Sequence, residues 1–454
     1  MTTVIQGCAV ATVDAAGTEH ADGHVVVDGD RIVAVGPGAA DASVLDGADE
    51  VVDGRGCLAT PGLVNTHHHL YQWATRGLAQ QDDLFGWLTT LYPVWEGLDE
   101  DVVGAAAAAG LGWLARTGCT STSDHHYVFP RDGGDVLGAT VAAAREVGLR
   151  FHPTRGSMDL GQSQGGLPPD SVVESTDVAL AGTLRALDEH HDPTPGSMLR
   201  MGVAPCSPFS VTEHLMREAA ALARERGVRL HTHLAETVDE DVFCRSRYDC
   251  TPTEYADSLG WLGDDVWLAH CVHVDDAAAK RLADTGTGVA HCPTSNARLG
   301  AGLAPVASWR EAGVSVGLGV DGSASNEESS LATELHAAVM VARLRGGPAS
   351  MSARDALALG TIGGARVLGR ADEIGSLEVG KLADVALWRV DGVAHAGCED
   401  PVAALVLGSR PPLVRLLVGG RTVVADDVLL TTDEDALAGR AARATRRLLA
   451  RSGR

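Results

Sequence analysis

The sequence predicts an α/β fold, a (β/α)8 barrel of the TIM type combined with a small β-sandwich domain that both chain ends build. Eight apolar runs with β character alternate with helical or mixed segments in the middle of the chain. Both ends contain short alternating runs typical of strands instead. No Gly-rich dinucleotide fingerprint follows a predicted strand, which disfavours the alternative of a doubly wound open sheet. The 454 residues suffice for a barrel of about 250 residues and a second module.

The first part of the chain, residues 1–59, is expected to form the N-terminal part of the sandwich. Residues 24–28 and 31–35 alternate on either side of the turn signal Asp28-Gly29-Asp30. The barrel is expected over residues 60–372, with Ala-rich helical stretches at 100–116, 213–226 and 275–284. Its predicted strands end at or near His69, His125, Arg155, Cys206, His233, His270, His291 and Asp321.

The last part, residues 373–454, is expected to complete the sandwich and to end in a helix. Residues 381–388 form a strand-like run, and residues 414–418 and 422–424 flank a Gly419-Gly420 turn in a hairpin pattern. Residues 433–449 are rich in Ala, Arg and Leu at helical spacing and predict a surface helix.

Composition excludes several classes of function. The formal net charge is −24, from 36 basic and 60 acidic residues, which argues against nucleic acid or an anionic membrane as a partner. No apolar run reaches the roughly 20 residues that span a bilayer. The N-terminus lacks a secretion signal, so a cytoplasmic location is expected. The nine cysteines form no Cys-x-x-Cys pair and are expected to be reduced and mostly buried.

Metal-capable side chains follow several predicted strands, whose carboxyl ends meet at one mouth of a barrel. Residues 61–66 lead into His67-His68-His69, where period-two alternation places His67 and His69 on the same side. The fifth strand offers His231 or His233, and His233 is favoured because it lies nearer the strand's end. With Asp321 after the eighth strand, these residues predict a first-row metal site of His67, His69, His233 and Asp321.

The same mouth is expected to carry the groups for hydrolysis. A metal ion lowers the pKa of water, and a neighbouring carboxylate can take its proton and return it to a leaving group. Glu236 and Asp321 can divide these duties, and His270 can orient the attacking oxygen. His291 is open to either a structural or a ligand-contacting role.

This pattern, His67-x-His69, His233-x-x-Glu236, His270 and Asp321, resembles the amidohydrolase superfamily, and in particular its nucleobase and triazine branch. Four segments, 65–72, 84–88, 291–299 and 320–326, are most similar to bacterial 8-oxoguanine deaminases. The resemblance implies one zinc ion, with iron or manganese as alternatives, and proton transfer by Glu236 to a ring nitrogen. It also implies hydrolytic loss of ammonia from an exocyclic amine, which for 8-oxoguanine gives urate.

Three residues are candidates for substrate contact. Gln72 matches the glutamine with which guanine deaminases contact a purine edge, since an amide offers both a donor and an acceptor. Arg155 can pair with a substrate carbonyl or anchor a structural carboxylate. Cys206 stands where many relatives carry a histidine, which weakens any transfer of an adenosine-type substrate.

The alternatives on the same scaffold are a guanine or isocytosine deaminase and an s-triazine chlorohydrolase or aminohydrolase. An alternative of another class is a non-catalytic binding protein stabilised by its metal. The expected partner is a small nucleobase or aza-aromatic molecule, and the chain is expected to form a homo-oligomer.

Overall fold

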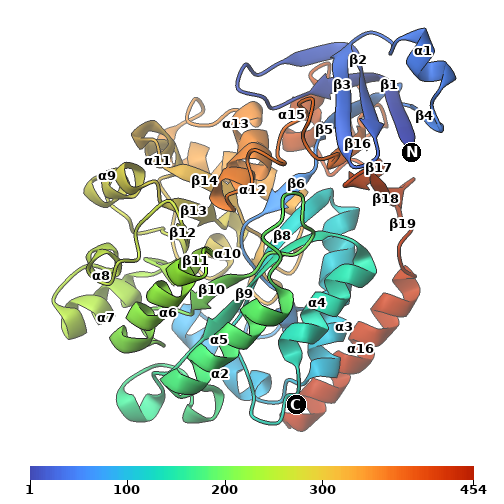
Figure 1. The fold of residues 1–454 in the computed structure, drawn as a ribbon. Helices are drawn as coiled ribbons and strands as arrows, with labels where there is room; N and C mark the ends of the chain where they lie inside the picture. Colours follow the sequence, from blue (N-terminus) through green and yellow to red (C-terminus); the bar gives the residue numbers. More distant parts are fainter. Residues whose placement is uncertain (454) are drawn as a thin grey trace.

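The computed structural model describes residues 1–453 and contains a closed barrel of eight parallel strands (Figure 1). The strands follow one another around the barrel in chain order, from β6 to β14 and back to β6. Every residue of the eight barrel strands is buried except Ser315, the first residue of β14. This is expected for strands that are covered on both faces. This confirms the predicted (β/α)8 barrel. The barrel strands are β6 (Leu63–Asn65), β8 (Cys119–His126), β9 (Arg150–Ser157), β10 (Gly202–Pro205), β11 (Leu230–Leu234), β12 (Val266–His270), β13 (Gly288–His291) and β14 (Ser315–Leu318).

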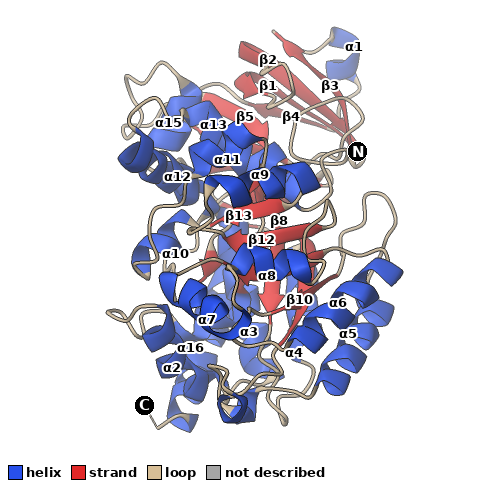
Figure 2. Ribbon diagram, turned by 90° about the vertical axis from the view of Figure 1, so that its left-hand side faces the viewer, coloured by secondary structure: helices blue, strands red, loops and turns tan. Residues whose placement is uncertain are grey.

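Helices surround the barrel strands (Figure 2). Many begin at a side chain that accepts a backbone N–H of the first turn, as Asp99 does from Val102 N at 2.9 Å. The helices are α1 (Ala42–Asp46), α2 (Leu84–Trp95), α3 (Glu100–Arg116), α4 (Val136–Val147), α5 (Thr176–His190), α6 (Glu213–Glu225), α7 (Val238–Tyr248), α8 (Pro252–Ser258), α9 (Asp276–Thr285), α10 (Pro293–Arg298), α11 (Val306–Ala312), α12 (Leu331–Gly346), α13 (Ala353–Ala358), α14 (Gly364–Val367), α15 (Pro401–Leu407) and α16 (Glu434–Arg451). The 3-10 helices are η1 (Leu70–Thr75), η2 (Gln162–Gln164) and η3 (Asp170–Val172), and η4 (Leu359–Gly363) is a π-helix. The four helices expected from the sequence are α3, α6, α9 and α16.

The two chain ends share one mixed sheet, with the first strands beside the last ones in Figure 1. Strand β1 pairs with β4 through its first half and with β5 through its second half, so the sheet branches there. Ile5, Val25, Val385 and Leu417 belong to one buried core, which joins both ends as predicted. The strands are β1 (Thr2–Ala11), β2 (Glu19–Asp28), β3 (Arg31–Pro37), β4 (Glu50–Asp53), β5 (Cys57–Pro61), β16 (Val385–Arg389), β17 (Leu413–Val418), β18 (Arg421–Ala425) and β19 (Val428–Leu429).

This sheet contacts the barrel where the barrel strands begin. Arg150, the first residue of β9, donates to both carboxylate oxygens of Asp384 at 3.1 Å. Gly118, just before β8, leaves room for Trp388, because a Cβ there would lie 2.1 Å from the indole. The opposite end of the barrel, where the strands finish, is therefore left for loops and the candidate site. Within residues 1–453, none of the helices has the length and apolar character needed to cross a membrane.

Candidate metal centre and active site

A two-residue strand pair brings the first and last parts of the barrel together at its mouth. β6 ends at Asn65, and the chain then resumes pairing as β7 (His68–His69) against β15 (Asp321–Gly322). Asp321 N donates to His67 O at 3.1 Å, and Asp321 has a left-handed backbone with φ 61°. Such a backbone is unfavourable for a non-glycine residue and is found where surrounding contacts hold it in place. The Asp321 side chain consequently faces the histidines that follow β6.

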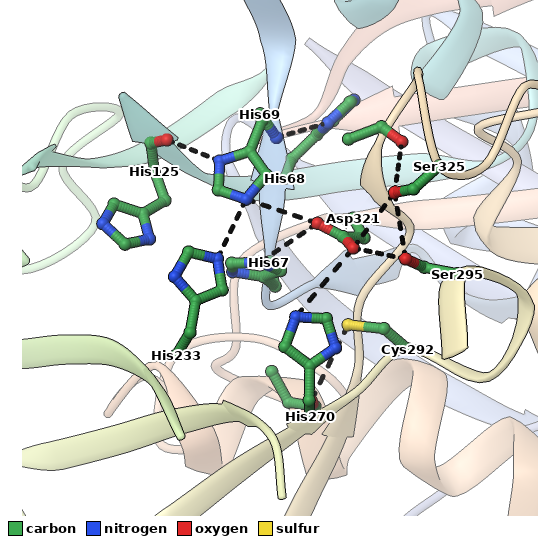
Figure 3. Close-up of polar contacts among 12 residues, drawn as sticks. His67, His68, His69, His125, His233, His270, Cys292, Ser295, Asp321 and Ser325 are labelled. Atoms are coloured by element: carbon green, nitrogen blue, oxygen red, sulfur yellow. Dashed lines mark hydrogen bonds and ion pairs between the residues drawn. The ribbon is translucent and has the colours of Figure 1, made fainter. Parts of the chain in front are cut away.

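Three imidazoles and one carboxylate face one another (Figure 3). His67 Nε2 and His69 Nε2 lie 3.2 Å and 3.3 Å from Asp321 Oδ1. His233 Nε2, from β11, lies 3.1 Å from His69 Nε2. All four side chains are buried, and His67 Nε2 has no hydrogen-bond partner. The structure thus brings together the four residues that the sequence nominated as metal ligands.

Hydrogen bonds at the Nδ1 atoms of His69 and His233 determine which ring nitrogen carries the hydrogen. His69 Nδ1 lies 2.6 Å from His125 O, and His233 Nδ1 lies 2.6 Å from Cys206 O. A carbonyl oxygen only accepts, so each Nδ1 carries the hydrogen and each Nε2 presents a lone pair in the neutral ring. Two lone pairs 3.1 Å apart repel unless a cation lies between them. Contacts of this kind, from the second ring nitrogen to a carbonyl, are typical of metal-binding histidines.

His231 lies behind the cluster and orients His67. Its Nδ1–H donates to Trp267 O at 2.9 Å, so its Nε2 accepts from His67 Nδ1 at 2.8 Å. His67 Nε2 is therefore left with a lone pair as well. Of the two histidines on β11, His233 faces the cluster directly and His231 supports it.

The surroundings of these four side chains keep them in the protonation states that metal binding requires. It lowers the pKa of His67 and His69 and brings that of His233 down to about 3, so the rings are neutral. Burial opposes ionisation of Asp321, but its contact with His67 and the charge of His270 outweigh it and hold its pKa well below the usual range. Neutral imidazoles and an ionised carboxylate are the forms that bind zinc.

Two further ionisable groups lie beside this cluster. His270 Nε2 is 3.6 Å from Glu236 Oε2 and 3.9 Å from Asp321 Oδ2. His270 Nδ1–H donates to Asn296 Oδ1 at 2.9 Å, which turns Nε2 toward the carboxylates. Burial raises the pKa of Glu236 to about 7. Burial also disfavours protonated His270, but the Glu236 and Asp321 carboxylates prevail and raise its pKa.

Two serines that the sequence did not single out contact Asp321. Ser295 Oγ donates to Asp321 Oδ2 at 2.5 Å, and Ser325 Oγ lies 3.2 Å from the same oxygen. They lie in the two polar segments after β13 and β14, which is a weak signal because such segments contain several hydroxyls. The hydroxyls hold one carboxylate oxygen and leave Oδ1 to the histidines.

A partly open pocket lies over this site. Its walls are largely aromatic and aliphatic, and its lining includes Gln72, Cys206, Glu236 and Ser325. Gln72 Oε1 is buried without a hydrogen-bond partner, which leaves an acceptor for a ligand. Further lining residues are Leu84, Trp87, Leu88, Tyr92, Tyr127, Ser207, Phe209 and Leu299.

Arg155 does not lie along this pocket. Its guanidinium pairs with Glu174 at 2.7 Å and lies over the Phe129 ring at 3.8 Å. It faces the helix layer, because a Cβ on Gly182 of α5 would lie 2.8 Å from Arg155 Nη2. The geometry therefore favours the structural alternative for Arg155. His291 is also outside the pocket lining, and both its ring nitrogens are buried without hydrogen-bond partners.

His125 joins the cluster as a residue whose role the sequence left open. It belongs to a group of metal-capable side chains with His67, His69 and His233. Its Nε2–H donates to Ala204 O at 2.8 Å, its ring stacks on His233, and its own carbonyl fixes His69. His125 thus orients two of the cluster histidines.

Comparison with known proteins agrees with this geometry. The sequence profile of the Amidohydrolase family matches residues 58–423. An 8-oxoguanine deaminase of Pseudomonas aeruginosa is 42% identical over 97% of this chain and 98% of its own. An isoxanthopterin deaminase from an unknown prokaryotic organism is 38% identical over 93% of this chain and 91% of its own.

Solved structures share the fold. The crystal structure of atrazine chlorohydrolase TrzN from Arthrobacter aurescens complexed with zinc matches with a TM-score of 0.92 at 34% identity. The match covers 98% of this chain and 100% of that chain. That relative holds zinc, and the histidine–aspartate cluster of this chain fits a zinc cofactor. The chain therefore belongs to the amidohydrolase family.

Proposed function

We propose that this protein is a zinc-dependent aminohydrolase that removes the exocyclic amine of a nucleobase, with 8-oxoguanine as substrate and urate and ammonia as products. The observation that carries the proposal is the close approach of His67, His69, His233 and Asp321 to one another beside Glu236 in a pocket. The 42% identity to an 8-oxoguanine deaminase over nearly the whole chain supports the choice of base.

The four converging side chains are proposed to hold the zinc ion. When bound there, zinc supplies a Lewis acid that lowers the pKa of water toward neutrality and stabilises negative charge on oxygen. Three neutral imidazoles and one carboxylate leave the net charge of such a site positive. Only Oδ1 of Asp321 faces the histidines, because Oδ2 is held by the hydroxyls of Ser295 and Ser325.

The proposed reaction balances with one water molecule. The water oxygen adds to the ring carbon that bears the amine, Asp321 accepts a proton from the water, and Glu236 gives a proton to the adjacent ring nitrogen. The amine then takes the proton held by Asp321 and leaves as ammonia, and the hydroxyl proton passes to Glu236, so the ring retains a carbonyl and both carboxyl groups return to their starting states. His270 orients the attacking oxygen from its place 3.6 Å from Glu236 and 3.9 Å from Asp321.

The pocket supports a flat, uncharged substrate. Among the described residues that line it there is no arginine or lysine, so it offers no cation to a phosphate or carboxylate group. Trp87, Tyr127 and Phe209 provide aromatic walls. Gln72 is proposed to contact the edge of the base through its free Oε1. Cys206 is proposed to lie against the substrate, because it lines the pocket beside His233 with Sγ 3.9 Å from Nδ1.

A second candidate is the hydrolysis of an s-triazine. The zinc-containing atrazine chlorohydrolase has the same fold, with a TM-score of 0.92. Both reactions place water on an electron-poor carbon of an aza-aromatic ring, so the metal ligands do not distinguish them. A non-catalytic binding protein is disfavoured, since a purely structural metal site has no use for Glu236 and His270 in the pocket wall.

A substrate panel tests the proposal directly. Purified, zinc-supplemented protein is presented with 8-oxoguanine, guanine, isocytosine, isoxanthopterin and a chlorotriazine, and ammonia and chloride release are measured. We expect the highest kcat/KM for 8-oxoguanine, with urate as the product. Chloride release from the triazine at a higher kcat/KM than ammonia release from any base would contradict the assignment.

A further inference from the structure

The chain makes an unfavourable turn immediately before Glu236. Ala235 follows the end of β11 and has a left-handed backbone with φ 51°. A non-glycine residue rarely adopts this conformation unless its surroundings hold it there. The turn is connected to the segment that follows β12, because Ala235 O accepts from His273 N at 3.0 Å. It directs the Glu236 side chain to the pocket, where the residue is 4% exposed.

A second glutamate lies beneath this turn. Glu240, in the first turn of α7, is completely buried. Its Oε1 accepts from Ala235 N at 2.8 Å, and its Oε2 accepts from Glu236 N at 3.2 Å. The two backbone amides that flank the Cα of Ala235 thus share one side chain as their acceptor.

The burial of Glu240 carries a cost that packing alone does not explain. Removing a carboxyl from water is unfavourable, and burial raises the pKa of Glu240 to about 8. The charged groups that act on it are Glu236 and His270, and it does not line the pocket. Its hydrogen bonds go to the two amides of the turn.

We propose that Glu240 is a positioning residue that holds the Ala235–Glu236 backbone so that the Glu236 carboxylate faces His270 and the pocket. Without its oxygens, two buried N–H groups lose their acceptors, and each such loss is unfavourable. The left-handed turn at Ala235 then relaxes, and Glu236 moves away from the position 3.6 Å from His270 Nε2. The kinetic part of this inference rests on the proposed function, whereas the structural part does not.

The structural part is tested by amide hydrogen exchange. Glu240→Gln keeps the size of the side chain but places an NH₂ group where an acceptor was. Asp239→Asn is the matched control, because it makes the same carboxyl-to-amide change on an exposed residue of the same helical turn. Mass spectrometry of a peptide covering residues 230–237 is expected to show faster exchange in Glu240→Gln than in wild type and unchanged exchange in Asp239→Asn.

A second variant guards against a folding defect. Glu240→Asp keeps the carboxyl group but withdraws it by one methylene, so we expect faster exchange in the same peptide and unchanged exchange elsewhere. Wild-type exchange in both Glu240 variants would overturn the inference, whether or not the protein deaminates any base.

The kinetic part is tested through Glu236. We expect Glu240→Gln to lower kcat by about tenfold to a hundredfold, as a displaced catalytic group does, while KM stays within about threefold. Zinc content should match wild type. In a Glu236→Gln background, Glu240→Gln should lower kcat by less than about twofold, because residues that act through one another are not additive.

Multiplicative losses in the double variant, or loss of zinc from Glu240→Gln, would show that Glu240 does not act through Glu236. Absence of ammonia release by the wild-type protein from every base tested would contradict the proposed function instead, and the exchange measurement still decides whether Glu240 holds the turn.

Discussion

Replacing Glu236 with glutamine removes a proton donor from the pocket while keeping its size. Both oxygens of the other pocket carboxylate, Asp321, are already engaged, Oδ1 by His67 and His69 and Oδ2 by two serine hydroxyls. In the proposed reaction Asp321 takes up the proton of the attacking water, so it does not replace Glu236 as the donor to the ring nitrogen. Proton transfer of this kind contributes about 10² to 10⁴ in rate, and we expect a loss in kcat of about a thousandfold, or roughly 4 kcal/mol.

The zinc content of Glu236→Gln should remain at the wild-type level. Glu236 is not among the side chains that converge on the cluster centre, and the contact measured for it is with His270 at 3.6 Å. The assay is ammonia release under saturating 8-oxoguanine, combined with elemental analysis of the same preparation. Ammonia release by Glu236→Gln at the wild-type rate would refute the proton-transfer role assigned to this residue.

Two further predictions concern the pocket and the buried carboxyl of Glu334. Gln72→Leu removes the unpartnered amide oxygen and should lower kcat/KM by about tenfold to a hundredfold; unchanged kcat/KM for every base would exclude Gln72 as a substrate contact. Burial raises the pKa of Glu334 from 4.5 to about 8, so the folded protein binds more protons than the unfolded chain between these values and loses stability as pH rises. Glu334→Gln lacks this titration, so its Tm should rise relative to wild type between about pH 5 and about pH 8, and parallel Tm curves would contradict the assignment.

The main parts of the site could be predicted from sequence, because the carboxyl ends of barrel strands meet at one mouth. His67, His69, His233 and Asp321 come from distant parts of the chain, yet parallel barrel strands deliver their final residues to one mouth. The choice of His233 over His231 followed from its place nearer the end of the strand. The role of His231 did not follow, because its contact with His67 crosses the barrel interior between strands that are not neighbours.

The other features of the site could not be predicted from sequence, because they depend on loop geometry and on the direction of side chains. β7 and β15 are two residues each, too short to leave a sequence pattern, although their pairing sets Asp321 beside the histidines. Arg155 ends a predicted strand, but its side chain turns outward to Glu174. The contacts of Ser295 and Ser325 depend on the placement of α10 and of the turn after β15, which spacing alone does not describe.

Elemental analysis of the purified protein tests the convergence of the four ligands most directly. The geometry predicts about one zinc ion per chain in the wild type, and little bound zinc in His67→Ala and in His233→Ala, each of which removes one converging Nε2 atom. Wild-type protein that binds no transition metal in stoichiometric amount, even after zinc supplementation, would contradict the account.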